Sequence, residues 1–199
     1  METQKKKNSE TRKNIVVGPW GGNGGTPWDD GSFTGVREIT LVYDRCIDSI
    51  RVLYDKSGRP FLAEKHGGNG GSLTARIKLQ LPEEFLTSVS GYYSPMVKGG
   101  TPVIRSLTLK TNQRSIGPFG VEEGTPFTFP MDGGLIVGFR GRSGWYLDAI
   151  GFGLSRHQTT SIFELMQQKL KKLGRLASIS ARQDNEEHAS QAKIAKSHT

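Results

Sequence analysis

The carboxylate of Asp148, in residues 141–151, is the side chain of this sequence best suited to bind a polar ligand. An ionised carboxylate only accepts hydrogen bonds, and its two oxygens can accept from neighbouring hydroxyl groups. Gly144 allows a sharp turn before it, and Trp145 and Tyr146 offer backbone N–H donors beside aromatic rings. We expect such a turn, at the start of a strand, to bind a ligand with adjacent hydroxyls, which means a sugar. The alternative is a turn whose aspartate bonds only its own backbone.

The segments around this turn have the pattern of strands. Residues 149–154 alternate small or flexible positions with apolar ones, and residues 135–139 form a continuous apolar run, as buried strands do. Alternation in residues 49–54, 76–81 and 106–110 predicts three more strands. With 26 glycines and 34% hydrophobic residues, the composition also favours a turn-rich, all-β fold.

Internal repeats predict how these strands are arranged. The sequence GGNGG occurs at residues 21–25 and 67–71, and residues 117–127 repeat the pattern of residues 18–28. A second series keeps the same spacing at residues 44–48, 91–95 and 144–148. We interpret the two series as three copies of one unit of about 50 residues, each with about four strands. One such sheet cannot bury its apolar face alone, so we expect three sheets in a prism with pseudo-threefold symmetry.

The charge and cysteine content limit the classes of function and compartment. The net charge of +8 lies mostly in residues 1–14 and 157–199, so no basic face for nucleic acid is expected on the folded body. A single cysteine, Cys46, cannot form an internal disulfide and favours the cytosol or nucleus. We expect no membrane span, because the sequence has no apolar run of about 18 residues. We expect no secretory signal, because no hydrophobic segment follows the polar N-terminus.

The flanks predict three regions: a disordered basic arm at residues 1–14, a domain at 15–156, and a basic tail at 157–199. The cluster at residues 5–7 is either a nuclear import signal or a solvated tail. Residues 160–177 have the spacing of a basic amphipathic helix, followed by a disordered end. Such a helix is suited to an anionic membrane, calmodulin or a partner helix, or to packing on its own prism or a twin subunit. An interaction or scaffold protein acting through this helix is the competing function.

Catalytic and metal-binding patterns are not found in the sequence. Of the four histidines only His66 lies in the body, and Cys46 has no evident histidine partner. No metal-ligand spacing is present, and no cofactor is expected. A glycosidase would need a second acid facing Asp148, for which Asp29 and Asp30 are the candidates. We expect a binding protein without enzymatic activity.

Three motifs give the chain a resemblance to a known family. They are the GGNGG turn near the start, GPFG with GTPF in the third copy, and G-R-S-G-x-x-x-D-A-I-G at the end. From residue 16 to residue 155 the chain resembles the plant jacalin-related lectins of the mannose-specific type. The resemblance implies a β-prism of three four-stranded Greek-key sheets. Mannose-binding members are uncleaved chains, generally cytoplasmic or nuclear, and the resemblance implies the same here. Galactose-binding members, in contrast, are cleaved to give a free N-terminal glycine at the sugar site.

The resemblance also implies the residues of a mannose or glucose site. Gly25 would donate its backbone N–H to one ring hydroxyl, and Trp145 and Tyr146 would donate theirs to the ring oxygen and primary hydroxyl. Asp148 would accept from two hydroxyls, and Gly144 would permit the turn. Such a site is shallow, so useful binding of glycans or glycoproteins would need several sites, and we expect a homo-oligomer.

By analogy with two-site members, a second site would contain Asp48, the backbone of Arg45 and Cys46, and Gly71. Asp44 stands there in place of the motif's glycine, where a side chain restricts φ and adds a negative charge. The third copy ends in Pro95 and lacks the carboxylate, so no site is expected there.

Overall fold

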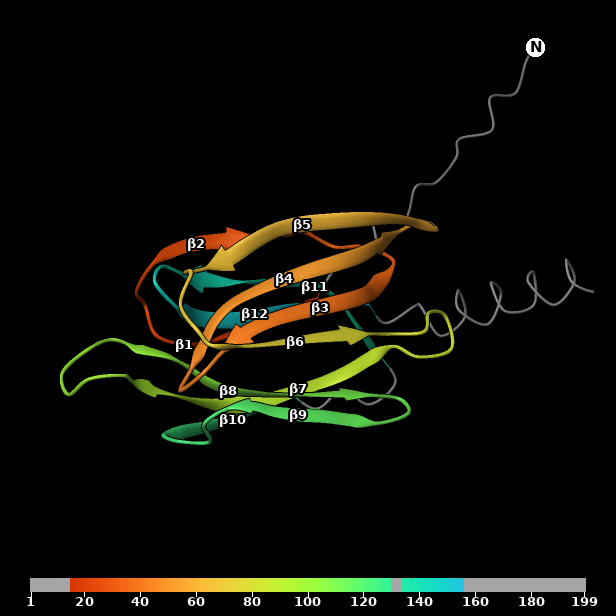
Figure 1. The fold of residues 1–199 in the computed structure, drawn as a ribbon. Helices are drawn as coiled ribbons and strands as arrows, with labels where there is room; N and C mark the ends of the chain where they lie inside the picture. Colours follow the sequence, from red (N-terminus) through yellow and green to blue (C-terminus); the bar gives the residue numbers. More distant parts are fainter. Residues whose placement is uncertain (1–14, 130–133, 156–199) are drawn as a thin grey trace, which may run out of the picture. The chain divides into compact units, whose positions relative to one another are not determined.

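The computed structural model describes residues 15–129 and 134–155. These residues form twelve strands in three four-stranded antiparallel sheets (Figure 1). The prediction of an all-β fold of three four-stranded sheets is confirmed. The basic arm at residues 1–14 and the helix predicted at residues 160–177 lie outside the described residues. Within the described part, no helix of the length and apolarity that a membrane span requires is present.

Each sheet contains strands of one copy of the repeat. The first sheet has the order β1-β12-β11-β2, with bounds Ile15–Gly21, Leu147–Ser155, Leu135–Ser143 and Thr26–Asp29. The second has the order β5-β4-β3-β6, with bounds Arg59–Gly67, Ile47–Lys56, Gly35–Tyr43 and Leu73–Lys78. The third has the order β10-β7-β8-β9, with bounds Thr125–Phe129, Leu86–Pro95, Pro102–Thr111 and Ser115–Gly120.

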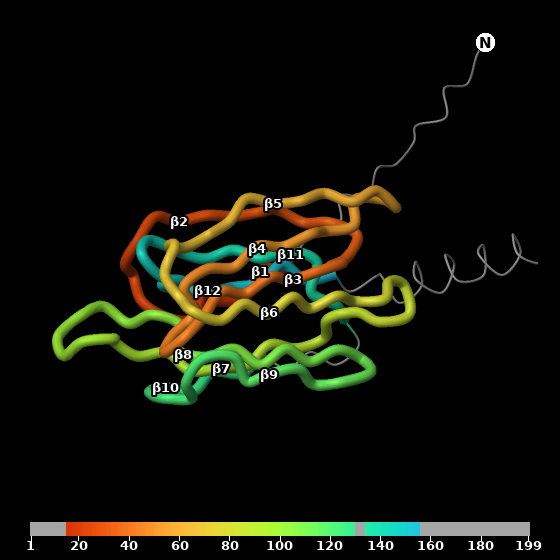
Figure 2. Tube along the Cα trace, viewed as in Figure 1, coloured from red at the N-terminus to blue at the C-terminus, as the bar shows by residue number. Residues whose placement is uncertain are grey.

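The connections explain why the first and last parts of the domain share a sheet. In the second and third sheets three consecutive strands form hairpins and the fourth returns beside the first, which is a Greek key. The first sheet has the same order, but β1 and β2 come from the start of the domain and β11 and β12 from its end (Figure 2). Strand β12 pairs with both β1 and β11, so it closes the domain.

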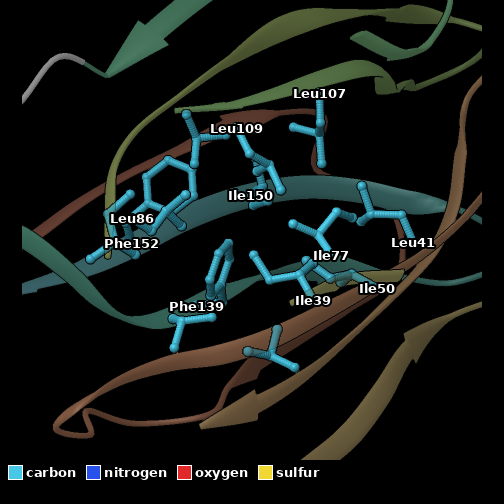
Figure 3. Close-up of a cluster of buried hydrophobic side chains, with 14 of the residues drawn as sticks. Ile39, Leu41, Ile50, Ile77, Leu86, Leu107, Leu109, Phe139, Ile150 and Phe152 are labelled. Atoms are coloured by element: carbon cyan, nitrogen blue, oxygen red, sulfur yellow. The ribbon is translucent and has the colours of Figure 1, made fainter. Parts of the chain in front are cut away.

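The inner faces of the three sheets form one apolar core. Figure 3 shows Ile39 and Ile50 of the second sheet beside Phe139 and Ile150 of the first, with Leu107 of the third above them. All five side chains are at most 1% exposed. Strand β12 is buried from residue 147 to residue 154, as the small–apolar alternation predicts for a strand inside the prism. The core holds each sheet by its interior face and leaves the loops at the ends for other roles.

Two kinds of loop meet at one end of the prism, on the left in Figure 1. We call residues 21–25, 67–71 and 120–124 the first, second and third glycine turns; they connect β1 to β2, β5 to β6 and β9 to β10. We call residues 144–146, 44–46 and 96–101 the first, second and third hairpin loops; they connect β11 to β12, β3 to β4 and β7 to β8. Each sheet therefore presents one glycine turn beside one hairpin loop.

Candidate functional site

The first glycine turn lies directly on the carboxylate of Asp148. A Cβ added to Gly24 would stand 2.6 Å from Oδ1 of Asp148, and one added to Gly25 would stand 2.5 Å from Oδ2. Gly25 also has a φ of +59°, in the left-handed region that side chains rarely adopt. Two residues from opposite ends of the domain are thus brought together, and glycine is required for their close approach.

The first hairpin loop completes this site and shows why residue 144 is a glycine. The Gly144 N–H donates to the Tyr146 carbonyl at 3.0 Å, and Trp145 is 86% exposed. Gly144 is not in the left-handed region, so the turn does not depend on a φ that side chains rarely adopt. A Cβ there would meet Gly25 Cα at 3.4 Å and Asp148 Oδ2 at 3.6 Å, which are ordinary contacts. Glycine at this position therefore keeps the space above Asp148 open.

Arg142 was missed as a functional residue in the sequence, although it lies inside the motif. Its Nε donates to the Gly24 carbonyl and its Nη2 to the Gly25 carbonyl, both at 2.8 Å. These two bonds hold the first glycine turn and thereby fix the direction of the Gly25 N–H. Nothing in a single sequence separates this arginine from an exposed charge on a strand, because its partners lie more than a hundred positions away along the chain.

Asp148 is buried and incompletely paired. It is 6% exposed, and its Oδ2 has no hydrogen-bond partner among the described residues. Burial raises the pKa of Asp148, while the backbone N–H of Gly144 and the positive charge of Arg142 lower it. A buried acceptor without a partner costs about 1–3 kcal/mol or more, which a ligand with hydroxyl donors can recover.

The second site repeats this arrangement. The Asp44 N–H donates to the Cys46 carbonyl at 3.1 Å, as Gly144 does to Tyr146. Asp48 is 4% exposed, its Oδ2 has no partner within the described residues, and a Cβ on Gly71 would stand 2.8 Å from that oxygen. Gly71 has a φ of +80°. The backbone geometry predicted from the repeat is present at both sites.

Asp44 distinguishes the second site, though not through its backbone. Its φ is outside the left-handed region, so the turn accommodates a side chain at this position. Its Oδ2 accepts from the Ser72 hydroxyl at 3.1 Å, which turns one oxygen toward the start of β6. Its charge still acts on the site, because the pKa of Asp48 is raised first by burial and then by Asp44. Cys46 is buried, and burial raises the pKa of its thiol to about 12, so the thiol stays protonated.

Both sites open into one depression of about 990 Å³. Its lining includes the carboxylates, glycines and hairpin loops of both sites together with the third hairpin loop: Gly24, Gly25, Asp44, Arg45, Cys46, Asp48, Asn69, Gly70, Gly71, Met96, Val97, Gly100, Thr101, Val103, Gly144, Trp145, Tyr146 and Asp148. The structure therefore brings all predicted residues of the two sites to one surface.

The third copy lacks a carboxylate for a different reason than the sequence indicates. In all three hairpins the register shifts by one residue just after the loop, at Asp148, Asp48 and Arg105. The Val121 N–H donates to the Arg105 carbonyl at 3.0 Å, as glycine-turn N–H groups do to the two aspartates. Arg105, and not Pro95, is thus the counterpart of the aspartates. The alignment on Pro95 was wrong because the third hairpin loop is longer than the other two.

The candidates for a second catalytic acid have other partners. Asp29 pairs with Arg140, and Asp30 accepts from Tyr54 Oη at 2.7 Å and contacts His66 Nε2 at 2.7 Å. Neither aspartate lines the depression. In the described ranges, no three His, Cys, Asp or Glu side chains are grouped so that they could hold a metal ion.

The three-sheet fold, with two buried carboxylates under glycine turns at one end, defines the class: a carbohydrate-binding lectin domain. Residues 17–153 match the family model described as "Jacalin-like lectin domain". The chain belongs to the jacalin-related lectin family.

Relatives and solved structures agree with this membership. "Jacalin-related lectin 19" of Arabidopsis thaliana is 64% identical over 81% of this chain and 92% of its own. A "Galactose-specific lectin" of Morus indica is 46% identical over 75% of this chain and 99% of its own. The structure of a mannose-specific jacalin-related lectin from Morus nigra with mannose is 52% identical, with a TM-score of 0.70 over 77% of this chain and 99% of that one. These relatives are carbohydrate-binding lectins and not enzymes.

Proposed function

We propose that this chain binds mannose- or glucose-type glycans at the first site. The backbone N–H groups of Gly25, Trp145 and Tyr146 donate to the sugar, and Asp148 accepts from two of its hydroxyls. The single observation that carries the proposal is the buried Oδ2 of Asp148, which lacks a partner among the described residues and lies under a turn that only glycine fits. A sugar with adjacent hydroxyls supplies the missing donors.

The expected affinity follows from the chemistry of the site. A hydrogen bond to a charged group contributes about 1.5–3 kcal/mol when water is excluded. The depression is open and Trp145 is 86% exposed, so much of the sugar stays in water. We expect a monosaccharide to bind with a Kd near 1 mM, which is about −4 kcal/mol.

Two observations support mannose or glucose over galactose. Solved relatives include artocarpin with mannotriose, 53% identical with a TM-score of 0.69 over 71% of this chain and 97% of that chain, and the Morus nigra lectin with mannose. Sequence identity alone does not decide the sugar specificity, because a galactose-specific relative is also 46% identical. The first glycine turn is internal to the sequence, directly after β1, which is the arrangement that the resemblance associates with uncleaved, mannose-specific chains. A site whose carboxylate accepts from two adjacent hydroxyls binds an epimer poorly, because a hydroxyl of the wrong configuration leaves the carboxylate without a donor.

The second site is proposed as a weaker site for the same class of sugar. It contains Asp48, Gly71 and the backbone of Arg45 and Cys46. Support comes from the unpaired Oδ2 of Asp48 and from the shared turn geometry. Two sites on one depression, multiplied in a homo-oligomer, would raise the avidity for glycans far above that of one site.

Calorimetric titration with methyl α-mannoside and methyl α-galactoside tests the proposal. We expect millimolar binding of the mannoside, no measurable binding of the galactoside, and loss of the tighter mannoside site in Asp148→Ala. Asp148→Ala removes a charged acceptor and little packing, so the fold should remain intact. Wild-type affinity in a folded Asp148→Ala variant would contradict the site, and preference for galactoside would contradict the specificity.

A further inference from the structure

The third copy has an arginine where the other two have a sugar-binding carboxylate. Arg105 is 2% exposed and its side chain 3% exposed. Its Nη2 donates to Glu123 Oε2 at 2.8 Å, and its Nη1 donates to Ser94 Oγ at 3.0 Å and the Pro95 carbonyl at 3.4 Å. The guanidinium therefore lies between the end of β7 and the third glycine turn.

One bond of this arginine crosses to another sheet. Nε of Arg105 donates to the Arg45 carbonyl at 3.0 Å, and Arg45 belongs to the second hairpin loop. A hydrogen bond from a charged donor is about twice as strong as a neutral one, and this one is shielded from water by the burial of Arg105. The second site is thus held by a residue of the third sheet.

The other two hairpin loops face their neighbours in a different way. Arg45 stands three residues before Asp48, and Trp145 and Pro102 stand three residues before Asp148 and Arg105. The carbonyls of Trp145, in the first hairpin loop, and of Pro102, the first residue of β8, are therefore the counterparts of the Arg45 carbonyl. Each lies against a glycine of the adjacent turn: a Cβ on Gly68 would collide with the Trp145 carbonyl, and one on Gly22 with the Pro102 carbonyl. In the third turn Val121 takes the place of these glycines, and the Arg105 side chain meets the carbonyl instead.

We infer that Arg105, supported by Glu123, is a positioning residue for the second sugar site. A peptide unit is planar and trans, so its C=O and N–H point in opposite directions. Holding the Arg45 carbonyl toward Arg105 aims the N–H of Cys46 away from it, and this N–H is a donor of the proposed second site. Arg105 does not contact the sugar. The inference rests on the proposed second site and extends it to a residue of another sheet.

Four full-length variants test this inference by titration with methyl α-mannoside. Asp148→Asn should leave only the second site active, and Asp48→Asn only the first. The other two variants combine each of these changes with Arg105→Met. We expect Arg105→Met to weaken the second site at least about tenfold and the first site less than about twofold. Arg105→Lys keeps the charge but has no planar fork to reach both Arg45 and Glu123, so it should recover only part of the second-site affinity.

The outcomes separate the inference from the proposed function. An equal loss at both sites, or no loss at the second, would overturn the positioning role. Absence of mannoside binding in Asp148→Asn with Arg105 intact would overturn the second site itself, and the inference with it. If Arg105→Met does not fold, Glu123→Gln replaces it: Glu123 is exposed, and we expect a loss of about twofold confined to the second site. No change at the second site in a folded Glu123→Gln variant would count against the inference.

Discussion

The first and second sites have the same backbone and different side chains. Both hairpin loops close with the same N–H to carbonyl bond, and both carboxylates are buried with an Oδ2 that has no partner in the part of the chain that the structure describes. Gly144 leaves the first carboxylate open, whereas Asp44 places a second carboxyl group beside Asp48. The fold therefore fixes the position of the acceptor and the donors in each copy, and the residue before the donors adjusts the strength of binding.

The electrostatics of the two carboxylates differ accordingly. Burial raises the pKa of both. At Asp148 the Gly144 N–H and Arg142 oppose this effect, whereas at Asp48 the charge of Asp44 adds to it. The surroundings of Asp148 therefore favour its charged form more than those of Asp48 do, and we expect the first site to bind sugar more tightly.

The glycine turns are held by a different basic residue in each copy. Arg142 bonds two carbonyls of the first turn, and Lys65 Nζ donates to the Gly68 carbonyl at 3.0 Å and to Asn69 Oδ1 in the second turn. Arg105 pairs with Glu123 of the third turn. Among the described residues, the first turn is the one in which a single planar guanidinium bonds two backbone carbonyls. A rigid turn keeps its N–H aimed at the ligand without an entropic cost at binding.

Among changes to the residues that hold the first and second glycine turns, loss of Arg142 should have the largest effect. Arg142→Met removes two charged hydrogen bonds to the first turn, and we expect about a tenfold weaker first site with an unchanged second site. Lys65→Met is the matched change at the second turn; both of its bonds are exposed, so the second site should weaken only about twofold. Titration in the Asp48→Asn and Asp148→Asn backgrounds measures each. Equal effects of the two changes would mean that the turns do not differ in support.

Asp44 and Gly144 are equivalent positions, and replacing either one by the residue at the other site should make the two sites more alike. Asp44→Gly removes a like charge from Asp48 and opens its pocket, so the second site should bind about threefold to fivefold more tightly. Gly144→Asp should weaken the first site by a similar factor, since a Cβ there contacts Gly25 and Asp148 Oδ2. Both substitutions are accommodated by the backbone, because neither position is in the left-handed region. An unchanged second site in Asp44→Gly would show that Ser72 already holds the Asp44 carboxylate clear of the sugar.

The two sites should also differ in their response to acid. A protonated carboxyl group no longer accepts at both oxygens, so affinity falls as the pH falls through the pKa of each aspartate. Both pKa values are raised above the ordinary aspartate value of 3.8, and only that of Asp48 lacks an opposing cause. As the pH is lowered, we expect the second site to lose mannoside affinity first. In mildly acidic buffer its loss of affinity should exceed that of the first site by about twofold to threefold. Coincident profiles in the Asp148→Asn and Asp48→Asn variants would contradict this ordering.

Removal of residues 157–199 should leave both sites as they are. All proposed sugar contacts lie between Gly25 and Asp148, so the monosaccharide affinities should stay within the error of calorimetry. Agglutination would weaken if the tail contributes to an oligomer. A large loss of affinity at either site would place part of the pocket in the tail and favour the competing function through residues 160–177.

The fold was largely predictable from the sequence because its signals are local or repeated. Alternation of apolar residues defines strands, and the two copies of GGNGG mark equivalent turns in two sheets. The division of the first sheet between the two ends of the domain could not be derived from strand pattern, because it depends on the pairing of β1 with β12. The helix predicted at residues 160–177 stays a prediction.

The site was predictable in its acceptors and not in its supports. Asp148 and Asp48 recur in step with the glycine turns, so the repeat identifies them. Arg142 and Arg105 act through partners distant in sequence, and Arg105 was hidden by a longer hairpin loop that shifted the alignment to Pro95. Gly144 is needed for open space above Asp148 and not for a left-handed φ, and the sequence alone does not separate these two uses of glycine.

The stoichiometry of mannoside binding tests most directly whether each buried carboxylate under a glycine turn is a sugar acceptor. We predict two sites per chain in the wild type, one in Asp148→Asn, one in Asp48→Asn, and none in the double variant. Thermal unfolding provides the control: burial raises both pKa values, so the charged forms are unfavourable in the fold, and neutral asparagines should not lower Tm. One site per chain in the wild type, or mannoside binding by a folded double variant, would contradict the account.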